Sequence, residues 1–443
     1  MSELHLRVYA NRSELVQPNG KSEVFLEGAT SVEAKERYAH IVKSLQNSFL
    51  RQQIELCRDK PHECELSVLT ALQRRLLDAI VGAMTSEAGR ALIGLTILQL
   101  TIKAICPEQS VRLHKGGSSA KDFSWRDGVS MRSLDNRYIT PALREYGLLK
   151  LNRDGFMMTR SLAENYPYSK VYKAYIKGAR AEWAMIVEAI DANEIHAKAA
   201  LQYVISQLLN GAEEFKNLAR QTLEVLLLKQ NAGGFNDRSV VLRLLSEHIR
   251  VSDYAARIME IGMHALIQAM QEASVLGNAT VKPLSQMRSA NKKHGNIGDV
   301  EILESGQIVE AWDAKYGKPY LRDELEELND KLVEHPNINV AGFVTSEAPE
   351  RQEELETRLF DIEQSHGIKI QIMRLDDWVD ALFERSLDAG ASEEELATLW
   401  VTAYTESLAQ HRPDIAPIDE PCYQWLNSLK SLLETNTGDK ITP

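Results

Sequence analysis

The second half of the sequence alternates short apolar runs with longer amphipathic stretches. Two strand-like runs, GDVEIL and QIVEAWDAK, are joined at Glu304-Ser305-Gly306, and a long helical pattern over 253–273 precedes them. The alternation continues with a helix over 320–333, a strand over 338–345, a helix over 350–366, a strand over 368–373 and a helix from 377. Because strands and helices pack as layers around one core, this order predicts an α/β domain with a mixed sheet flanked by helices.

The first half is expected to be mainly helical. Residues 1–60 combine a short strand-like start with a helix from Val32 to about Leu56, separated by the turn signal Pro18-Asn19-Gly20. Apolar residues at helical spacing recur over 66–105 and 177–228. The expected fold class is therefore α plus α/β, with two acidic helices at the C-terminus forming an appendage.

Composition excludes disorder and predicts a soluble chain. Hydrophobic residues make up 44% and charged residues 26% of the 443 residues, which is typical of folded proteins. The longest apolar stretch, 91–100, is about half of the ~20 residues that a membrane span needs. The N-terminus has no basic and apolar signal pattern, and four cysteines are too few for a disulfide framework. We therefore expect no membrane association and a cytoplasmic location.

Charge is unevenly distributed along the chain. The net charge is −12, which alone argues against a nucleic-acid partner. Between residues 101 and 180, however, fifteen basic side chains face seven acidic ones, an excess of eight positive charges. Aromatic residues are interleaved with these basic residues, as in many nucleic-acid-binding regions. This window is therefore the candidate DNA-binding region.

Within the basic window, a helix is followed directly by a hairpin pattern. Ser133 and Asp135 are possible N-caps of a helix that stops at Gly147, although Pro141 favours a start at Thr140. The following LLKLNRDGFMMT contains Asp-Gly, a strong hairpin turn signal. Helix and hairpin together predict a winged-helix-like module; the alternative is a surface helix and hairpin whose charges are merely solvated.

A winged-helix-like module assigns separate roles to its two parts. The helix enters the major groove, where Arg pairs with guanine and Asn with adenine, and the hairpin follows the phosphates. The expected base-reading residues are Asn136, Arg137 and Arg144. The expected phosphate contacts of the hairpin are Lys150, Arg153 and Arg160.

Polar residues interrupt the two apolar strands over 298–315. Asp299 opens the first strand, and Asp313 and Lys315 close the second. Side chains alternate in a strand, so Asp313 and Lys315 share one face and Asp299 shares a face with Glu301. Two carboxylates can hold Mg²⁺, and a nearby lysine can stabilise negative charge on a phosphate. The plain alternative is a strand-end salt bridge between Asp313 and Lys315.

At these residues the sequence resembles the PD-(D/E)xK nuclease superfamily over about residues 250–385. Gly298-Asp299 stands for the Pro-Asp pair, with Gly replacing Pro, and Asp313-Ala314-Lys315 stands for (D/E)xK. The resemblance implies that Asp299 and Asp313 are Mg²⁺ ligands and that Lys315 is the catalytic lysine. Glu310 is an alternative ligand that lies on the opposite face unless a bulge turns it inward, and Glu301 is a weaker one. The resemblance also implies a helix carboxylate, for which Glu260 and Glu272 remain open.

The pair RSLDNRYITPALREYGLL and GDVEI is similar to type II restriction endonucleases of the SacI kind. This resemblance implies Mg²⁺-dependent hydrolysis of specific double-stranded DNA sites, a homodimer and a cognate DNA methyltransferase. No P-loop motif is present, so no nucleotide cofactor is expected. The alternatives are a structure- or damage-specific DNA nuclease and a non-catalytic winged-helix regulator. The expected segments are 1–65, a helical DNA-recognition region 66–230, a nuclease domain 236–390 and the helical appendage 391–443.

Overall fold

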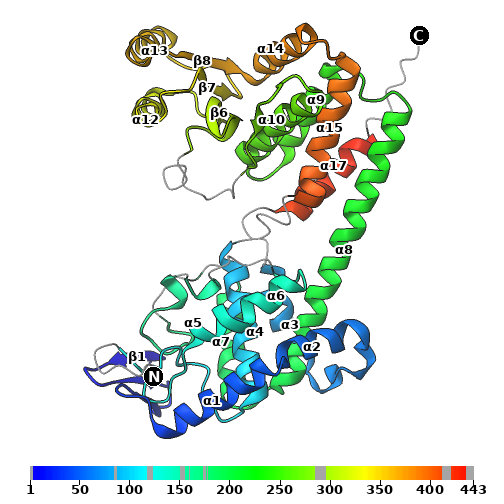
Figure 1. Ribbon diagram of the computed structural model, residues 1–443. Coiled ribbons are helices and arrows are strands. Elements are labelled where there is room, and N and C mark those ends of the chain that lie inside the picture. Colours follow the sequence, from blue (N-terminus) through cyan, green and yellow to red (C-terminus); the bar gives the residue numbers. More distant parts are fainter. Residues whose placement is uncertain are drawn as a thin grey trace. The chain divides into compact units, whose positions relative to one another are not determined.

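The computed structural model describes residues 3–83, 87–116, 123–149, 155–158, 160–172, 176, 178–284, 296–411 and 421–435. The chain divides into two compact units, Met1–Glu214 and Phe215–Pro443 (Figure 1). Within the described ranges, no helix is both long and apolar enough to cross a membrane.

The first unit begins with a small antiparallel sheet in the order β1-β2-β3. Its strands are β1 His5–Val8, β2 Arg12–Val16 and β3 Ser22–Leu26. The turn at Pro18-Asn19-Gly20 joins β2 to β3, so the expectation that it separates a strand from a helix was wrong. Gly20 has a φ of 82° there, and its N–H donates to the Gln17 carbonyl at 2.9 Å. The two runs of this hairpin are short and only partly apolar, which hid it from the period-two pattern.

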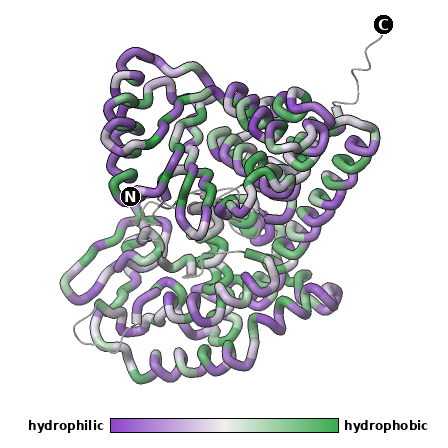
Figure 2. Tube along the Cα trace, turned by 45° about the horizontal axis from the view of Figure 1, so that its top comes forward, coloured by the Kyte–Doolittle hydropathy of each residue, from purple (hydrophilic) through white to green (hydrophobic). Residues whose placement is uncertain are grey.

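Helices make up most of the rest of the first unit. Hydrophobic and hydrophilic residues alternate along them, as Figure 2 shows. The single helix expected from Val32 to Leu56 is two helices, because Ser48 adopts a left-handed φ of 65° between them. The helices are α1 Val32–Gln46, α2 Phe49–Asp59, α3 Ala71–Gly82, α4 Glu87–Ile105, α5 Met131–Leu134, α6 Thr140–Glu145, α7 Arg180–Asp191 and α8 Ala197–Asn231, with short turns η1 Pro61–Glu63, η2 Leu66–Val68, η4 Asp135–Ile139, η5 Phe156–Met158 and η6 Arg160–Leu162. The long helix α8 continues past Glu214 into the second unit.

The helix of the basic window runs through α5, η4 and α6 without a break. Its π-helical centre, η4, ends where Pro141 enters α6. Proline has no N–H to donate and its ring clashes with the carbonyl four residues earlier, and a wider turn relieves both problems. Ser133 and Asp135 were wrong as caps, since the run begins at Met131, whereas the alternative start at Thr140 agrees with α6, which begins there with Pro141 in its first turn. The stop was right: Gly147 has a φ of 65° just beyond the last turn.

The expected hairpin after this helix is wrong in its second arm. Phe156–Met158 forms a 3₁₀ turn rather than a strand. Phe156 and Met157 are both buried, whereas neighbours in a half-exposed strand would point to opposite faces. The N–H of Met157 donates to the buried carboxylate of Asp135 at 2.9 Å, which fixes the turn against α5 and η4. The turn at 150–154 lies outside the described residues.

The second unit contains a mixed sheet of five strands in the order β4-β5-β6-β7-β8. The β4-β5 and β5-β6 pairs are antiparallel, and the β6-β7 and β7-β8 pairs are parallel. The expected α/β order with a mixed sheet is therefore confirmed, and four strands fall where the sequence predicts them. The strands are β4 Thr280–Val281, β5 Val300–Glu304, β6 Gln307–Lys315, β7 Val340–Thr345 and β8 Lys369–Arg374.

Helices cover both faces of this sheet. In Figure 1, α12 Arg322–Leu332 and α13 Gln352–His366 lie to one side of β6–β8, with α10 Ala255–Glu272 and α14 Leu375–Asp388 on the other. The apolar residues divide accordingly. Ala311 and Phe343 pack with the leucines of α12, whereas Trp312 and Val344 pack with α10 and α14. Alternation along β6 and β7 thus supplies one side chain to each core in turn.

The C-terminal helices share a core with the sheet's second face. Trp400 and Trp425 belong to the same hydrophobic cluster as Trp312 and Trp378, although they lie in the segment that the sequence analysis sets apart as an appendage. The indole N–H of Trp400 donates to the carbonyl of Gly262 in α10 at 2.9 Å. The C-terminal helices are α15 Glu393–Glu406, η7 Ser407–His411 and α17 Cys422–Thr435, and α9 Arg238–Val251 contributes to the same core.

A buried histidine at this junction predicts acid sensitivity of the second unit. His248 is fully buried; its Nε2 donates to the Trp425 carbonyl at 2.8 Å, and its Nδ1 lies 2.5 Å from the Tyr404 hydroxyl. Burial lowers the pKa of His248 to about 4. An unfolded histidine titrates near pH ~6.5, so the unfolded chain binds the proton more readily between these values. The stability contributed by neutral His248 is therefore complete above pH ~6.5 and is lost as the pH falls toward 4.

Replacing His248 by glutamine should flatten this pH dependence. From the two pKa values, the titration of His248 costs the wild type about 2 kcal/mol between pH 7 and pH 5. Urea titrations of both proteins at the two pH values measure the difference. An equal loss of stability on acidification in wild type and His248→Gln would show that another group is responsible.

Candidate active site

Asp299 immediately precedes β5 and is tied to β6 by its backbone and its side chain. Its N–H donates to the Trp312 carbonyl at 2.9 Å, and its Oδ2 accepts from the Ala314 N–H at 3.0 Å. Because Asp299 is bonded across the strand to the residues that flank Asp313, the antiparallel pairing of β5 with β6 brings the two carboxyl groups together.

Asp313 and Lys315 lie on the same face of β6, as strand alternation predicts. The Lys315 Nζ is 2.9 Å from the Asp313 Oδ2, and each side chain is 15% exposed. The ammonium group also lies 5.8 Å from the centre of the Phe343 ring on β7. The lysine is therefore held by a carboxylate and an aromatic ring, while it still reaches solvent.

All three residues line one pocket of about 250 Å³. Glu260 on α10 and Lys318 beyond the end of β6 complete its polar wall. Lys318 also pairs with Glu324 on α12 at 2.6 Å. Sequence reasoning missed Lys318, although its position three residues after Lys315 places it beside the same strand end. The full lining is Ala256, Glu260, Asp299, Asp313, Ala314, Lys315, Tyr316 and Lys318.

The two aspartates titrate differently because their surroundings differ. Burial, followed by the charge and hydrogen bond of Asp313, raises the pKa of Asp299 well above its ordinary value. Burial also raises the pKa of Asp313, but the hydrogen bond from Asp299 and the charge of Lys315 outweigh it and lower the pKa overall. At Lys315, burial lowers the pKa, but the charge and hydrogen bond of Asp313, together with the charges of Asp299 and Glu324, outweigh it and raise the pKa overall. The two carboxyl groups therefore titrate as an interacting pair, in which Asp299 is the weaker acid.

The positions of Glu260 and Glu272 on α10 distinguish the two candidate helix carboxylates. Glu260 lines the pocket, and its negative charge contributes to the raised pKa of Asp299. It also pairs with Arg257 one turn earlier on α10. Glu272 lies at the far end of the helix and accepts from Gln268 at 3.0 Å. Glu260 is therefore the carboxylate that α10 contributes to the pocket.

Glu310 lies on the opposite face of β6 from Asp313. It accepts hydrogen bonds from the Trp312 indole and from Arg385 on α14, both at 2.8 Å. The pairing of β5 with β6 does contain a bulge, between Ile302 and Leu303, yet it does not turn Glu310 into the pocket. The ranking of Asp313 above Glu310 therefore agrees with the geometry.

Glu301 also lies outside the pocket. Its side chain is 2% exposed and pairs with Lys282 at 2.6 Å. The other carboxylate oxygen accepts from the backbone N–H of Ile297 at 2.6 Å and of Gly298 at 3.3 Å. Both of its carboxylate oxygens are engaged by these contacts, and Glu301 is not among the residues that line the pocket, so the geometry gives no support to Glu301 as a metal ligand.

Glycine is structurally required at position 298. A Cβ there would lie 2.7 Å from the carbonyl oxygen of Trp312 and 2.8 Å from its carbon, closer than side-chain carbons approach backbone. The segment before Asp299 therefore runs directly against β6. A side chain at position 298 would collide with β6, so glycine is the residue that fits there.

The donor set suits a magnesium ion better than a caged metal. Within the described ranges, no group of three or more His, Cys, Asp or Glu side chains is arranged to hold a metal. Mg²⁺, however, is usually held by one or two carboxylates, with water and substrate phosphate as the remaining ligands. Asp299 and Asp313 form such a pair at the wall of an open pocket. A cation between them would also relieve the repulsion between the two carboxylates.

The expected base-reading residues lie on the exposed side of the 131–145 helical run. Asn136 and Arg137 are exposed on η4, and Arg144 is exposed on α6. Lys150 and Arg153 lie outside the described residues, as does the side chain of Arg160. Three of the six residues that are expected to contact DNA therefore lie at described, exposed positions.

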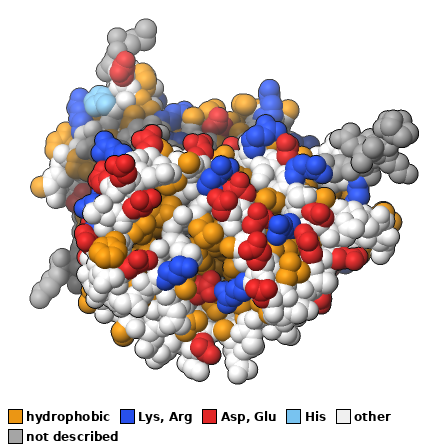
Figure 3. Space-filling view, turned by 90° about the horizontal axis from the view of Figure 1, so that it is seen from above, with side chains coloured by type: hydrophobic (Ala, Val, Ile, Leu, Met, Phe, Trp, Pro, Cys, Tyr) orange, Lys and Arg blue, Asp and Glu red, His pale blue; other side chains and the backbone are white. Residues whose placement is uncertain are grey.

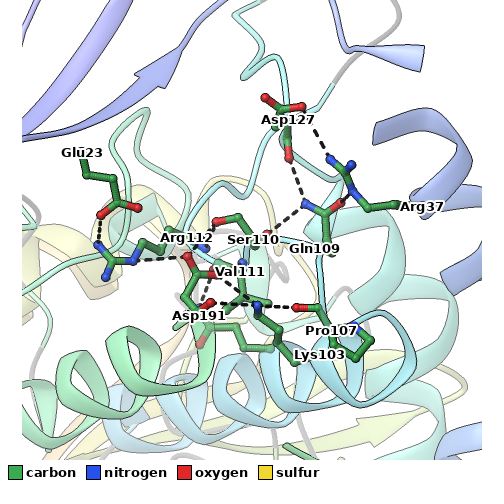
Figure 4. Close-up of polar contacts among 11 residues, drawn as sticks. Glu23, Arg37, Lys103, Pro107, Gln109, Ser110, Val111, Arg112, Asp127 and Asp191 are labelled. Carbon is green, nitrogen blue, oxygen red and sulfur yellow. Dashed lines mark hydrogen bonds and ion pairs between the residues drawn. The ribbon is translucent and has the colours of Figure 1, made fainter. Parts of the chain in front are cut away.

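Several cations of the basic window are internal rather than available to a ligand. Lys103 is 3% exposed and donates to the Pro107 carbonyl at 2.7 Å, and Arg112 pairs with Glu23 at 3.1 Å. Both converge on Asp191, which also accepts from Val111 N–H at 2.8 Å (Figure 4). The excess of eight positive charges therefore overstates what this surface offers to DNA. On the face drawn in Figure 3, by comparison, Lys and Arg are intermingled with Asp and Glu.

Comparison with protein-family models and with curated protein sequences found no match to this chain.

Proposed function

We propose that the chain is a Mg²⁺-dependent nuclease that hydrolyses phosphodiester bonds in double-stranded DNA. The observation that carries this proposal is the convergence of Asp299, Asp313 and Lys315 on one pocket. A structural salt bridge alone would need only Asp313 and Lys315. It would not need a second, buried aspartate against them and a glutamate from a neighbouring helix.

Each side chain of the pocket has a distinct role in this proposal. Asp299 and Asp313 would hold the ion, with Glu260 at the edge of the pocket. An ion held by these carboxylates would supply polarisation of the scissile phosphate and a lowered pKa for a water molecule. Lys315, held 2.9 Å from Asp313, places a positive charge beside the phosphate and stabilises the charge that develops there. Lys318 is positioned to bind a neighbouring phosphate of the strand.

Duplex DNA is the proposed substrate because of the exposed helical surface in the first unit. Arg137 and Arg144 lie seven residues apart, and Asn136 adjoins Arg137, so one groove-facing surface could present all three. A type II restriction endonuclease acting as a homodimer, with a cognate methyltransferase protecting host DNA, is the narrower form of this proposal. A two-fold dimer matches a palindromic site and cuts both strands.

Arg137→Ala and Arg144→Ala should weaken binding to the preferred site and relax its base preference. A bidentate arginine–guanine contact contributes ~1–3 kcal/mol of discrimination, so each change should cost about five- to 150-fold in specific affinity. Competition binding with specific and unrelated duplexes measures this. Arg250→Ala, at an exposed arginine of α9, is the control. Unaltered preference in both test variants would remove this helix from the recognition surface.

Sequencing the ends of a randomised duplex library digested with Mg²⁺ tests the proposed function. Cleavage at one short motif would support restriction. Cleavage only at mismatched, nicked or branched substrates would instead identify a structure- or damage-specific nuclease. An intact library, with intact branched substrates, would refute the nuclease proposal.

A further inference from the structure

The segment that leads into Asp299 is anchored by a buried carboxylate. Glu301 Oε1 accepts from the N–H groups of Ile297 and Gly298, while Oε2 accepts from the Lys282 ammonium. Asn296, Ile297 and Gly298 belong to no strand, so no ladder of backbone hydrogen bonds holds them. The side chain of Glu301 supplies the missing acceptor from the adjacent strand, β5.

The same segment is held at two further points. Lys282 Nζ also donates to the Asn296 Oδ1 at 2.8 Å, so one ammonium bridges Glu301 and the start of the segment. Lys331 on α12 donates to the Ile297 carbonyl at 3.3 Å. Both N–H groups and a carbonyl group of the backbone just before Asp299 are therefore held by side chains.

We propose that Glu301 is a positioning residue, which fixes the backbone before Asp299 and thereby sets the Asp299 carboxylate against Asp313. This inference rests on the proposed nuclease function. Asp299 itself is bonded to β6 through its N–H and its carboxylate. Glu301 holds the backbone that leads into it, where Gly298 has no side chain to anchor the chain. Charge-assisted hydrogen bonds in a buried setting are strong enough for this task, because two N–H groups would otherwise be left unsatisfied.

This role is different from metal binding and predicts a different response to substitution. Glutamine keeps an oxygen that can accept from Ile297 and Gly298, whereas leucine keeps only the volume. An anchor should therefore tolerate Glu301→Gln, and a ligand that needs negative charge should not. Misplacing a catalytic group by ~1 Å can cost about 10²-fold in rate. We expect Glu301→Leu to lose cleavage by this factor and Glu301→Gln to stay within about fivefold of wild type.

The test compares full-length wild type, Glu301→Gln, Glu301→Leu and the control Glu304→Leu, which makes the same change at an exposed position of β5. Hydrogen–deuterium exchange over 296–300 measures how firmly Glu301 holds this segment. Single-turnover cleavage and DNA-binding titrations measure the effect on catalysis and on DNA affinity. We expect Glu301→Leu alone to show faster exchange and a lower cleavage rate, with unchanged DNA affinity.

Three outcomes would overturn the inference. Unchanged exchange in Glu301→Leu would show that Glu301 does not anchor the segment, and full activity of that variant would show that the anchor does not matter. A Glu301→Gln enzyme as inactive as Asp299→Ala would make the negative charge itself essential, as for a ligand. If the wild type cleaves no DNA, the nuclease proposal fails, while the exchange measurement still decides whether Glu301 anchors the segment.

Discussion

Asp299→Ala, Asp313→Ala and Lys315→Ala are each expected to reduce Mg²⁺-dependent DNA cleavage by at least about 10³-fold, or roughly 4 kcal/mol of transition-state stabilisation. The first two changes remove the proposed ligands, and the third removes the positive charge next to the phosphate. DNA binding should survive, because the proposed recognition residues lie in the first unit. In the absence of metal, the two alanine variants at aspartate positions should bind DNA more tightly, since repulsion of phosphate falls.

Glu310→Gln is the matched control for these three variants. It alters a carboxylate of the same strand that faces Trp312 and Arg385 instead of the pocket. Cleavage should therefore be retained. If Glu310→Gln were inactive and Asp313→Ala remained active, Glu310 would be the ligand. Persistent cleavage by both Asp299→Ala and Lys315→Ala would leave the pocket without a catalytic role.

Trp400→Ala should destabilise the second unit by ~3–5 kcal/mol, the usual cost of truncating a fully buried aromatic residue. Trp400 is 1% exposed, packs with Phe383 at a ring separation of 5.9 Å and donates its indole N–H to the Gly262 carbonyl. The variant leaves a cavity in the core shared with α10, the helix that carries Glu260. Urea unfolding followed by tryptophan fluorescence and circular dichroism measures the change.

Tyr423→Ala is the control for Trp400, because it removes an aromatic side chain that is 45% exposed on α17. Its effect should stay within about 0.5 kcal/mol, as for most surface substitutions. A Trp400→Ala protein as stable as Tyr423→Ala would show that the C-terminal helices are an appendage after all.

Much of the second unit could be predicted because its sequence pattern is local. β6 can be predicted directly from QIVEAWDAK, since a strand between two helical layers is largely apolar; apart from Glu310, its polar residues lie at its ends. That is also why Asp313 and Lys315 stand out. The partnership of Asp299 with them follows from antiparallel pairing and a short Ser305-Gly306 turn.

Other features depend on contacts that alternation does not encode. Glu301 shares a strand with buried apolar residues, and its partners Ile297 and Gly298 lie in an irregular segment whose path no local pattern specifies. In the first unit, the Asp154-Gly155 signal suggested a hairpin, but the buried Asp135 draws Met157 into a 3₁₀ turn instead. Counting charges likewise could not show that Lys103 and Arg112 are buried.

Magnesium dependence at Asp313 can be measured by single-turnover cleavage of a supercoiled plasmid that carries the preferred site, over a range of Mg²⁺ concentrations. We expect the wild-type rate to be zero in excess chelator and to rise with Mg²⁺ to a plateau, and the Asp313→Ala rate to stay near zero at every concentration. Equal wild-type rates with Mg²⁺ and with chelator, or an Asp313→Ala enzyme that cuts at the wild-type rate, would contradict this expectation.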